Sequence, residues 1–253
     1  MKVITLNVNG IRAAAKKGFF EWLDKQDPDF VCLQETKSQE DVRNHSIFMP
    51  EKYHCAYSDA EKKGYSGVAL FAKEKPLHIR KGWGWDVSDR EGRYLQFDYE
   101  DFSVVSLYVP SGSSGEERQR VKFEFLEKFQ TYLAHLEPGR SYIFCGDWNI
   151  AHTNRDLKNW RGNQKNSGFL PEERAWLDNL FGPLGFVDLF RTVNQEEAQY
   201  TWWSNRGQAW ALNVGWRIDY QVATPGFKAR VVHASIYKEE RFSDHAPLIL
   251  EYA

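Results

Sequence analysis

The chain has 253 residues, of which 42% are hydrophobic and 27% are charged, and its formal net charge is -2 at pH 7. This composition is typical of a globular protein with ample material for a core, and it argues against a disordered chain. No run of 18 apolar residues occurs, so we expect no membrane partner. The near-neutral charge does not by itself mark a nucleic-acid binder, although residues 151–168 are locally basic.

The cysteines and the N-terminal segment favour a cytoplasmic protein. Cys32 and Cys145 lie inside apolar runs, where a reduced cysteine behaves as a small hydrophobic residue, and Cys55 is the third. This pattern indicates no disulfide framework. Residues 2–8 have the pattern of a strand and not of a signal peptide.

The first half of the chain predicts strands with one helix packed against them. A helix is expected over residues 12–25, where Phe19, Phe20, Trp22 and Leu23 follow a helical spacing. Residues 36–64 show no clear period. Strands are expected at residues 2–8, 29–34, 67–73 and 77–80, and a hairpin at 93–99 and 103–109.

The second half predicts two helices, several late strands and one long loop. A Gly/Ser loop at 111–115 precedes a helix over 116–136, and Pro171 suits the first turn of a helix that ends at Phe181. The polar loop 151–170 is long enough to suggest a functional role. Strands are expected at 142–145, 200–203, 217–223, 230–234 and 247–252. Since no repeat or linker interrupts the pattern, we expect one α/β domain with a mixed sheet over residues 1–253.

Polar residues recur where the predicted strands end. Gly146 ends a buried strand, and Asp147 and Asn149 follow two residues apart, so their side chains point to the same side. Gly, Asp and Asn are also common in ordinary turns, which is the alternative interpretation. Other strand ends supply Asn7, Glu35 and Asp219, and the pair Asp244–His245 opens the final strand. Such hard oxygen ligands suit Mg²⁺ or Mn²⁺ better than zinc.

Six sequence blocks in order carry a family resemblance from residue 2 to residue 250. The blocks are Leu6–Arg12, Pro28–Lys37, Tyr108–Pro110, Gly146–Ile150, Tyr200–Trp203 with Asn213–Tyr220, and Ser243–Pro247. The chain resembles the exonuclease III family of abasic-site (AP) endonucleases, within the DNase I-like endonuclease/exonuclease/phosphatase superfamily. Some positions depart from the family pattern: residues 188–192 match it only in part, Thr224 replaces a usual Ser, and Ser111, Ser113 and Ser114 replace residues that grip DNA in some relatives.

The resemblance implies a fold, an activity and partners. The implied fold is a single-domain, two-sheet sandwich flanked by helices in four layers. The implied activity is Mg²⁺-dependent cleavage of the phosphodiester 5′ to an abasic site in double-stranded DNA, leaving a 3′-hydroxyl, with Mn²⁺ as a substitute. Removal of 3′ blocking groups and 3′→5′ exonuclease activity accompany it, and a monomer is expected. The same fold also serves phosphatases of inositol phosphates and sphingomyelinases, which reuse the acidic core.

The resemblance also assigns roles to individual residues. Asp147 is the expected base for the attacking water, Asn149 and Tyr108 contact the phosphate, and His245 is a cation held by Asp219. The expected metal ligands are Glu35, Asn7 and Asp244, with Asp147, Asn149 and His245 available to a second ion.

Two further groups of residues are assigned to the substrate. Trp202, Trp216 and Ile218 are the expected walls of a pocket for an extruded sugar, although large aromatics on strands are more often core. The long loop, with His152 and Asn163, is expected at the DNA surface. The expected DNA contacts are Arg155, Lys165, Asn166, Arg206 and Ser111.

Overall fold

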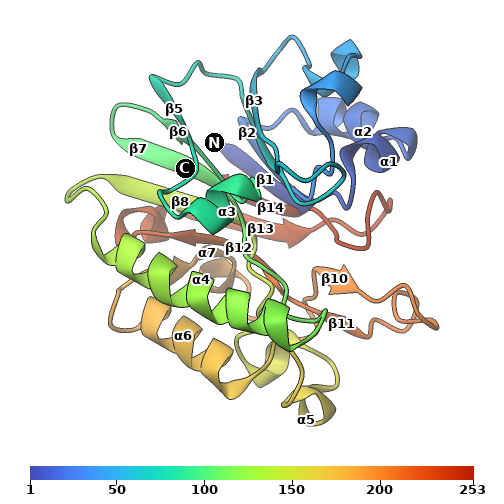
Figure 1. Cartoon of the computed structure of the whole chain (residues 1–253), viewed down its shortest axis with the longest axis vertical. Coiled ribbons are helices and arrows are strands. Elements are labelled where there is room, and N and C mark those ends of the chain that lie inside the picture. Colours follow the sequence, from blue (N-terminus) through green and yellow to red (C-terminus); the bar gives the residue numbers. More distant parts are fainter.

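The computed structural model describes residues 1–253, and all but two of its strands form two six-stranded sheets packed face to face (Figure 1). The first sheet has the order β13 (Val231–Ile236), β14 (Leu248–Tyr252), β1 (Lys2–Asn7), β2 (Phe30–Gln34), β4 (Val68–Ala72) and β3 (His54–Ser58). The second has the order β5 (His78–Lys81), β6 (Tyr94–Asp98), β7 (Phe102–Tyr108), β8 (Ser141–Asp147), β12 (Asp219–Ala223) and β9 (Val187–Asp188). The pairs β1–β2 and β7–β8 are parallel and all other pairs are antiparallel, which confirms the predicted mixed α/β sandwich.

The sandwich is held by apolar side chains that alternate along each strand. In β2, Phe30 and Cys32 face the space between the sheets, whereas Val31 and Leu33 face the outer helices. All five residues of this strand are buried because both faces of the sheet are covered. A few buried polar bonds also cross between the sheets: Gln34 donates to Ser106 Oγ (3.1 Å), and Gln221 donates to the carbonyl of Val3 (3.0 Å).

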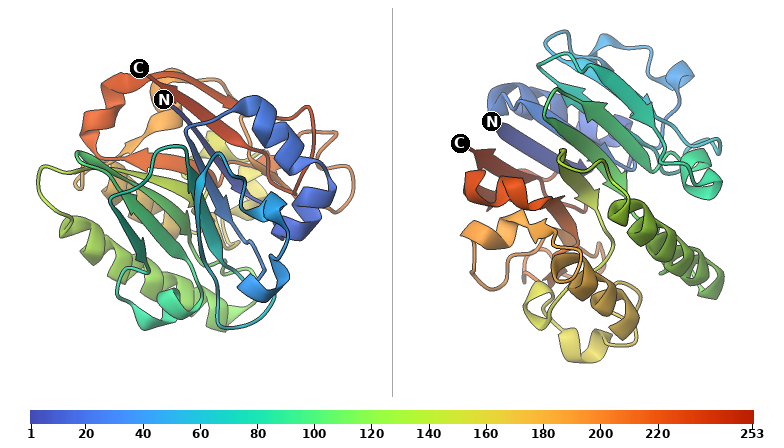
Figure 2. Two further views of the ribbon diagram at one scale, coloured as in Figure 1. Left: turned by 90° about the horizontal axis from the view of Figure 1, so that it is seen from above. Right: turned by 90° about the vertical axis from the view of Figure 1, so that its left-hand side faces the viewer.

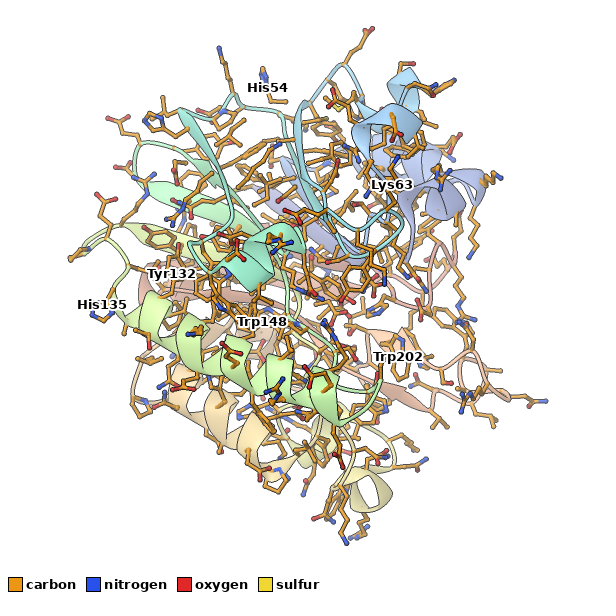
Figure 3. All side chains as sticks on the ribbon, viewed as in Figure 1. His54, Lys63, Tyr132, His135, Trp148 and Trp202 are labelled. Carbon is orange, nitrogen blue, oxygen red and sulfur yellow. The ribbon has the colours of Figure 1, made fainter.

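Helices cover both outer faces of the sandwich and complete the four layers (Figure 2). Helices α1 (Ile11–Lys16) and α2 (Phe19–Gln26) pack on the first sheet, and α4 (Glu116–Ala134) and α6 (Pro171–Phe181) pack on the second. Trp148 is buried beneath α4 (Figure 3). None of the helices combines the length and apolar character that crossing a membrane requires.

The remaining elements are short and lie in the connections. They are α3 (Asp86–Arg90), α5 (Trp160–Asn163), α7 (Leu189–Val193), β10 (Trp202–Trp203), β11 (Gly215–Trp216), and four 3₁₀ turns at Glu40–Val42, Ser46–Phe48, Asn154–Asp156 and Pro225–Arg230.

One prediction of local structure is wrong, and two segments hold more regular structure than the sequence indicated. The helix expected over 12–25 is two helices, because Gly18 takes a left-handed φ of 83° and turns the chain between them. The apparently patternless segment 36–64 contains β3 at the edge of the first sheet. The long loop 151–170 is not without structure, since it includes the 3₁₀ turn at Asn154–Asp156 and α5.

Candidate active site

The acidic residues meet because of strand register in the second sheet. Asp147 is the last residue of β8, two positions beyond the predicted end of that strand. It lies opposite Tyr108 in the parallel strand β7 and opposite Asp219 in the antiparallel strand β12. Residues opposite one another on neighbouring strands point to the same face, so these three side chains converge.

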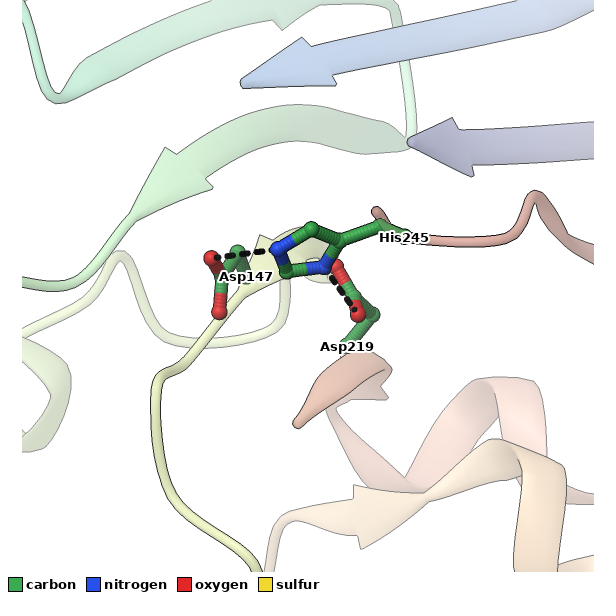
Figure 4. A group of neighbouring side chains, drawn as sticks. All are labelled: Asp147, Asp219 and His245. Atoms are coloured by element: carbon green, nitrogen blue, oxygen red, sulfur yellow. Dashed lines mark hydrogen bonds and ion pairs between the residues drawn. The ribbon is translucent and has the colours of Figure 1, made fainter. Parts of the chain in front are cut away.

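His245 lies between two buried carboxylates (Figure 4). Its Nδ1 is 2.9 Å from Asp219 Oδ2, and its Nε2 is 3.8 Å from Asp147 Oδ2. Burial alone lowers the pKa of the imidazole, but the carboxylates of Asp219, Asp147 and Asp244 outweigh that effect and raise it to about 10. The raised pKa favours the protonated ring at neutral pH, where it pairs with both carboxylates. Asp147, Asp219 and His245 also lie close enough together for their ligand atoms to hold a metal ion, so the predicted second-ion role of His245 stays a prediction.

The main chain around His245 is fixed by strand-like pairing with the start of β10. Trp202 forms a bridge with His245, and Ala246 N–H donates to the carbonyl of Thr201 (2.8 Å). The Thr201 hydroxyl accepts the backbone N–H of both Ile218 and Asp219 (3.1 Å each). One buried threonine thus aligns the strand that carries the partner carboxylate of the histidine.

Asn7 joins the two sheets at the centre of the site. Its Nδ2 donates to Glu35 Oε1 and to Asp147 Oδ2, both at 2.9 Å, and Asn9 N–H donates to its Oδ1. Glu35 also pairs with Lys37 Nζ at 2.8 Å. Burial opposes ionisation of Glu35, but Lys37 and the Asn7 hydrogen bond outweigh it, so the pKa of Glu35 lies below its usual value.

Asp147 is the most perturbed acid of the site. Its burial and the neighbouring charge of Asp219 raise its pKa to about 7, against the opposing effects of His245 and the Asn7 hydrogen bond. A carboxyl group with a pKa near neutrality accepts a proton readily at physiological pH, which suits general base catalysis. Its Oδ1 accepts the N–H of Asn149 at 2.9 Å, and the Asn149 amide donates to the carbonyl of Val109 at 2.8 Å.

Left-handed backbone conformations concentrate at this site. Asn9, Glu35 and Asn149 have φ angles of 44°, 50° and 53°. Such angles are uncommon for residues other than glycine, and they are typical of functional sites whose surroundings hold the chain in place.

These residues open into a hollow of about 270 Å³ that has one polar wall and one apolar wall. Trp202 and Trp216 form the apolar side with Ile218, and their rings meet edge to face with centroids 6.3 Å apart. Both tryptophans are only half-buried, which distinguishes them from core aromatics such as Trp148. The predicted residues that line the hollow are Glu35, Tyr108, Ser111, Asp147, Asn149, Asn166, Trp202, Trp216, Ile218, Asp244 and His245.

The donor set fits a hard divalent cation. Glu35 and Asp244 offer carboxylate oxygens beside the amide oxygen of Asn7, and no cysteine lies among them. Four carboxylates, at positions 35, 147, 219 and 244, face two cationic side chains, Lys37 and His245. When all six groups are ionised, the cluster has a net charge of -2, which one bound divalent cation would neutralise.

The remaining predicted residues do not line the hollow. Asn7 and Asp219 are buried behind it, where they hold Glu35 and His245. Lys165 and Arg206 are exposed. Arg155 donates to Gln195 and lines a different hollow of about 690 Å³.

Several residues of the site were not singled out from the sequence. Asn9 donates to Asp244 (3.0 Å) and accepts from Lys37 (2.5 Å), so it links two of the charged groups. Asn9 and Lys37 stand inside the blocks that carry the family resemblance, which was the available signal. Thr201 also lies in one of these blocks, but its side chain could be placed only once the strands were paired.

Comparison with known proteins identifies the family. Residues 4–245 match the model of the Endonuclease/Exonuclease/phosphatase family. The chain is 40% identical over 252 residues to an exodeoxyribonuclease of Bacillus subtilis (strain 168), covering 99% of this chain and 98% of the relative. It is also 40% identical over 253 residues to the DNA repair nuclease APEX1 of Danio rerio, covering 99% and 81%.

The fold gives the same result. An AP endonuclease from Archaeoglobus fulgidus superposes with a TM-score of 0.90 and 28% identity, covering 100% of this chain and 99% of that one. These matches bear out the predicted resemblance over the whole chain. The chain therefore belongs to the endonuclease/exonuclease/phosphatase family and is a hydrolytic nuclease of its exonuclease III branch.

Proposed function

We propose that this protein is a Mg²⁺-dependent AP endonuclease of DNA repair, which cleaves the phosphodiester 5′ to an abasic site in double-stranded DNA and leaves a 3′-hydroxyl. One observation carries the proposal: a hollow of about 270 Å³ places a buried acid–histidine cluster directly beside an apolar wall made by Trp202, Trp216 and Ile218. The polar side suits phosphodiester hydrolysis, and the apolar side suits a sugar that has lost its base.

Asp147 is the proposed general base. Water attacks the phosphorus and gives one proton to Asp147 as the new oxygen–phosphorus bond forms. The bond from phosphorus to the 3′-oxygen breaks, and that oxygen leaves with the bonding electron pair and takes a proton from solvent to become the 3′-hydroxyl. The elevated pKa of Asp147, about 7, lets it take this proton near neutral pH. Asn7 holds Asp147 Oδ2 at 2.9 Å, so one carboxylate oxygen is fixed while the proton is transferred.

His245 and Asn149 are the proposed phosphate ligands. The imidazolium of His245 offers a fixed positive charge beside the base, and Asp219 maintains it. An asparagine amide has two N–H groups, and Val109 accepts one of those of Asn149, which leaves the second for a phosphate oxygen. Tyr108 has a pKa well above its usual value because of burial and the nearby Glu35, so its hydroxyl stays protonated and can donate.

The proposed cation site is formed by Glu35, Asn7 and Asp244. When bound there, Mg²⁺ or Mn²⁺ would offset charge on the phosphate and on the leaving oxygen. Glu35 remains ionised at neutral pH because its pKa is lowered, and so does Asp244, whose burial is outweighed by His245 and three hydrogen bonds.

Selection of abasic sites is assigned to the apolar wall. Turning an abasic sugar out of the helix is cheaper than turning out a paired nucleotide, which costs a few kcal/mol more. A wall of two tryptophans and an isoleucine would also receive the bare sugar and clash with an attached base. The same pocket can accept damaged 3′ ends, which supports the accompanying 3′-end cleaning and 3′→5′ exonuclease activities.

The proposed setting is a monomer in the cytoplasm. A monomer is supported because one chain contributes every residue of the cluster and of the hollow. The reducing cytoplasm is supported by three free cysteines, of which Cys32 and Cys145 are buried.

The direct test compares four substrates with the purified protein in Mg²⁺ and in excess EDTA. The substrates are a duplex with one abasic site, the matched intact duplex, a recessed 3′ end and an inositol phosphate. On the abasic duplex we expect a single nick 5′ to the abasic site that leaves a 3′-hydroxyl. We expect slower digestion of the recessed 3′ end and no release of phosphate from the inositol phosphate. Phosphate release from the inositol compound without nicking would refute the proposal.

A further inference from the structure

A buried lysine–glutamate pair lies behind the active site and belongs to neither wall of the hollow. Lys122 of α4 and Glu173 of α6 are both fully buried, with Nζ and Oε1 2.6 Å apart. Burying two charges is costly, and replacing such a pair by neutral residues of similar volume is often neutral or stabilising. Stability alone is therefore a poor reason for this pair.

The other bonds of the pair end on the two loops that border the hollow. Lys122 Nζ donates to the carbonyl of Asn149 (2.8 Å), the residue next but one to Asp147. Glu173 Oε2 accepts the N–H of Gly168 (2.6 Å) and of Leu170 (3.0 Å). Asn149 and Gly168 both line the hollow.

Both anchored loops have backbone conformations that need support. Asn149 has a φ of 53°, and Gly168 has a φ of 91°. A Cβ at Gly168 would lie 3.1 Å from the carbonyl oxygen of Asn149 and 3.2 Å from Trp216 Cζ3. The two loops and the apolar wall are thus packed directly against one another, and a shift in one displaces the others.

A third loop is attached through Gln119, one helical turn before Lys122. Gln119 Nε2 donates to Glu173 Oε1 at 3.1 Å. A Cβ at Gly112 would lie only 1.9 Å from Gln119 Oε1, so the segment 111–113 rests on this side chain. Ser111 and Ser113 of that segment also line the hollow.

We propose that Lys122 and Glu173 are positioning residues for DNA cleavage, which fix Asn149 and Gly168 so that base, phosphate ligand and sugar wall keep one geometry. This inference rests on the proposed function. Neither side chain reaches the hollow, so their effect acts through the loops. A displacement of about 1 Å in such a site can cost roughly 10²-fold in rate.

The test is the double variant Lys122→Met/Glu173→Gln, which removes both charges and keeps the volume. The introduced glutamine retains a neutral acceptor oxygen, while the introduced methionine offers no donor to Asn149. We expect kcat on an abasic duplex to fall about 10- to 100-fold, with KM for DNA changed less than about threefold and the melting temperature near that of the wild type.

The matched control is the variant Arg43→Met/Asp59→Asn. This pair makes two bonds of 2.8 Å, the Arg43 side chain is 6% exposed, and its other bonds go to Ser38, outside the hollow. We expect its kcat to equal that of the wild type. An equal fall of kcat in both variants, or wild-type kcat in the Lys122/Glu173 variant, would overturn the inference.

Amide hydrogen exchange gives a second readout that does not need DNA. We expect the Gly168 amide to exchange at least about tenfold faster in the Lys122/Glu173 variant, since a neutral amide is a weaker acceptor than a carboxylate. Unchanged exchange at Gly168 would overturn the anchoring. A wild-type protein that cleaves none of the DNA substrates would instead overturn the proposed function, and the exchange result would still decide whether the pair holds this loop.

Discussion

Replacing Asp219 by asparagine tests whether its carboxylate keeps His245 positively charged. The side chains meet at 2.9 Å, and Asp219 is the largest of the effects that raise the pKa of His245 to about 10. Without that elevation the pKa returns toward the ordinary value of about 6.5. At pH 8 the protonated fraction then falls from nearly all to about 3%, so the rate falls by up to roughly thirtyfold.

The assay is the pH dependence of kcat/KM for nicking an abasic duplex between pH 5.5 and 10. We expect the wild-type activity to rise as Asp147 ionises near pH 7 and to fall only as His245 loses its proton near pH 10, whereas Asp219→Asn loses activity from about pH 7 upward. Asp178→Asn is the matched control, because Asp178 pairs with His152 at 2.7 Å outside the hollow. A constant ratio of wild type to Asp219→Asn at all pH values would refute the reasoning.

The same pair predicts how stability depends on pH. The pKa of His245 is higher in the folded protein than in the unfolded chain, so its contribution to stability is fully present below about pH 6.5. That contribution is lost as the pH rises through about 10. The melting temperature of Asp219→Asn should therefore differ most from the wild type at pH 6 and least near pH 10.

Three further perturbations separate the base, the metal site and the sugar wall. Asp147→Asn should lower the rate about 10²- to 10⁴-fold. It should also raise the melting temperature at pH 8. The pKa of Asp147 is about 7 in the folded protein, above that of the unfolded chain, so ionising this buried acid lowers the stability as the pH rises toward 7. A rate loss below about threefold would exclude Asp147 as the base. EDTA should abolish wild-type activity, and Glu35→Ala should raise the Mg²⁺ concentration for half-maximal rate by about tenfold or more; full activity in excess EDTA would remove the ligand assignment. Trp216→Ala should lower the ratio of kcat/KM on abasic to intact duplex, whereas Trp210→Ala, outside the hollow, should leave it unchanged; an unaltered ratio in Trp216→Ala would show that selection lies elsewhere.

The sequence identified site residues best where a polar side chain stands at the end of a predicted strand. Glu35 and Asp147 could be identified because each stands at the end of a buried apolar run. Alternation along β8 then gives the side to which Asp147 points, whereas Glu35 follows β2 with a left-handed φ of 50° that alternation does not predict. The helix break at Gly18 could not be identified, because the apolar spacing continues across it and only the left-handed turn separates the two helices.

Long-range partners were beyond the sequence for a physical reason. Lys122 sits on the buried side of α4 among apolar residues, and its partner Glu173 is 51 positions away. Nothing local distinguishes this lysine from a solvated one until α4 and α6 are packed together. The charge of Arg155 likewise gave no indication that its side chain would turn to Gln195, away from the hollow.

The hydrogen bonds of Asn7 make catalytic activity depend on how the two sheets are docked. Its amide, at the end of a strand in the first sheet, holds Glu35 from the same sheet and Asp147 from the second within 2.9 Å each. A slip of one sheet over the other by a fraction of a strand residue would break one of these bonds while each sheet kept its own ladder intact. Loss of activity should then precede loss of secondary structure during gentle denaturation. The enzyme would be active only while both sheets are folded and correctly docked on each other.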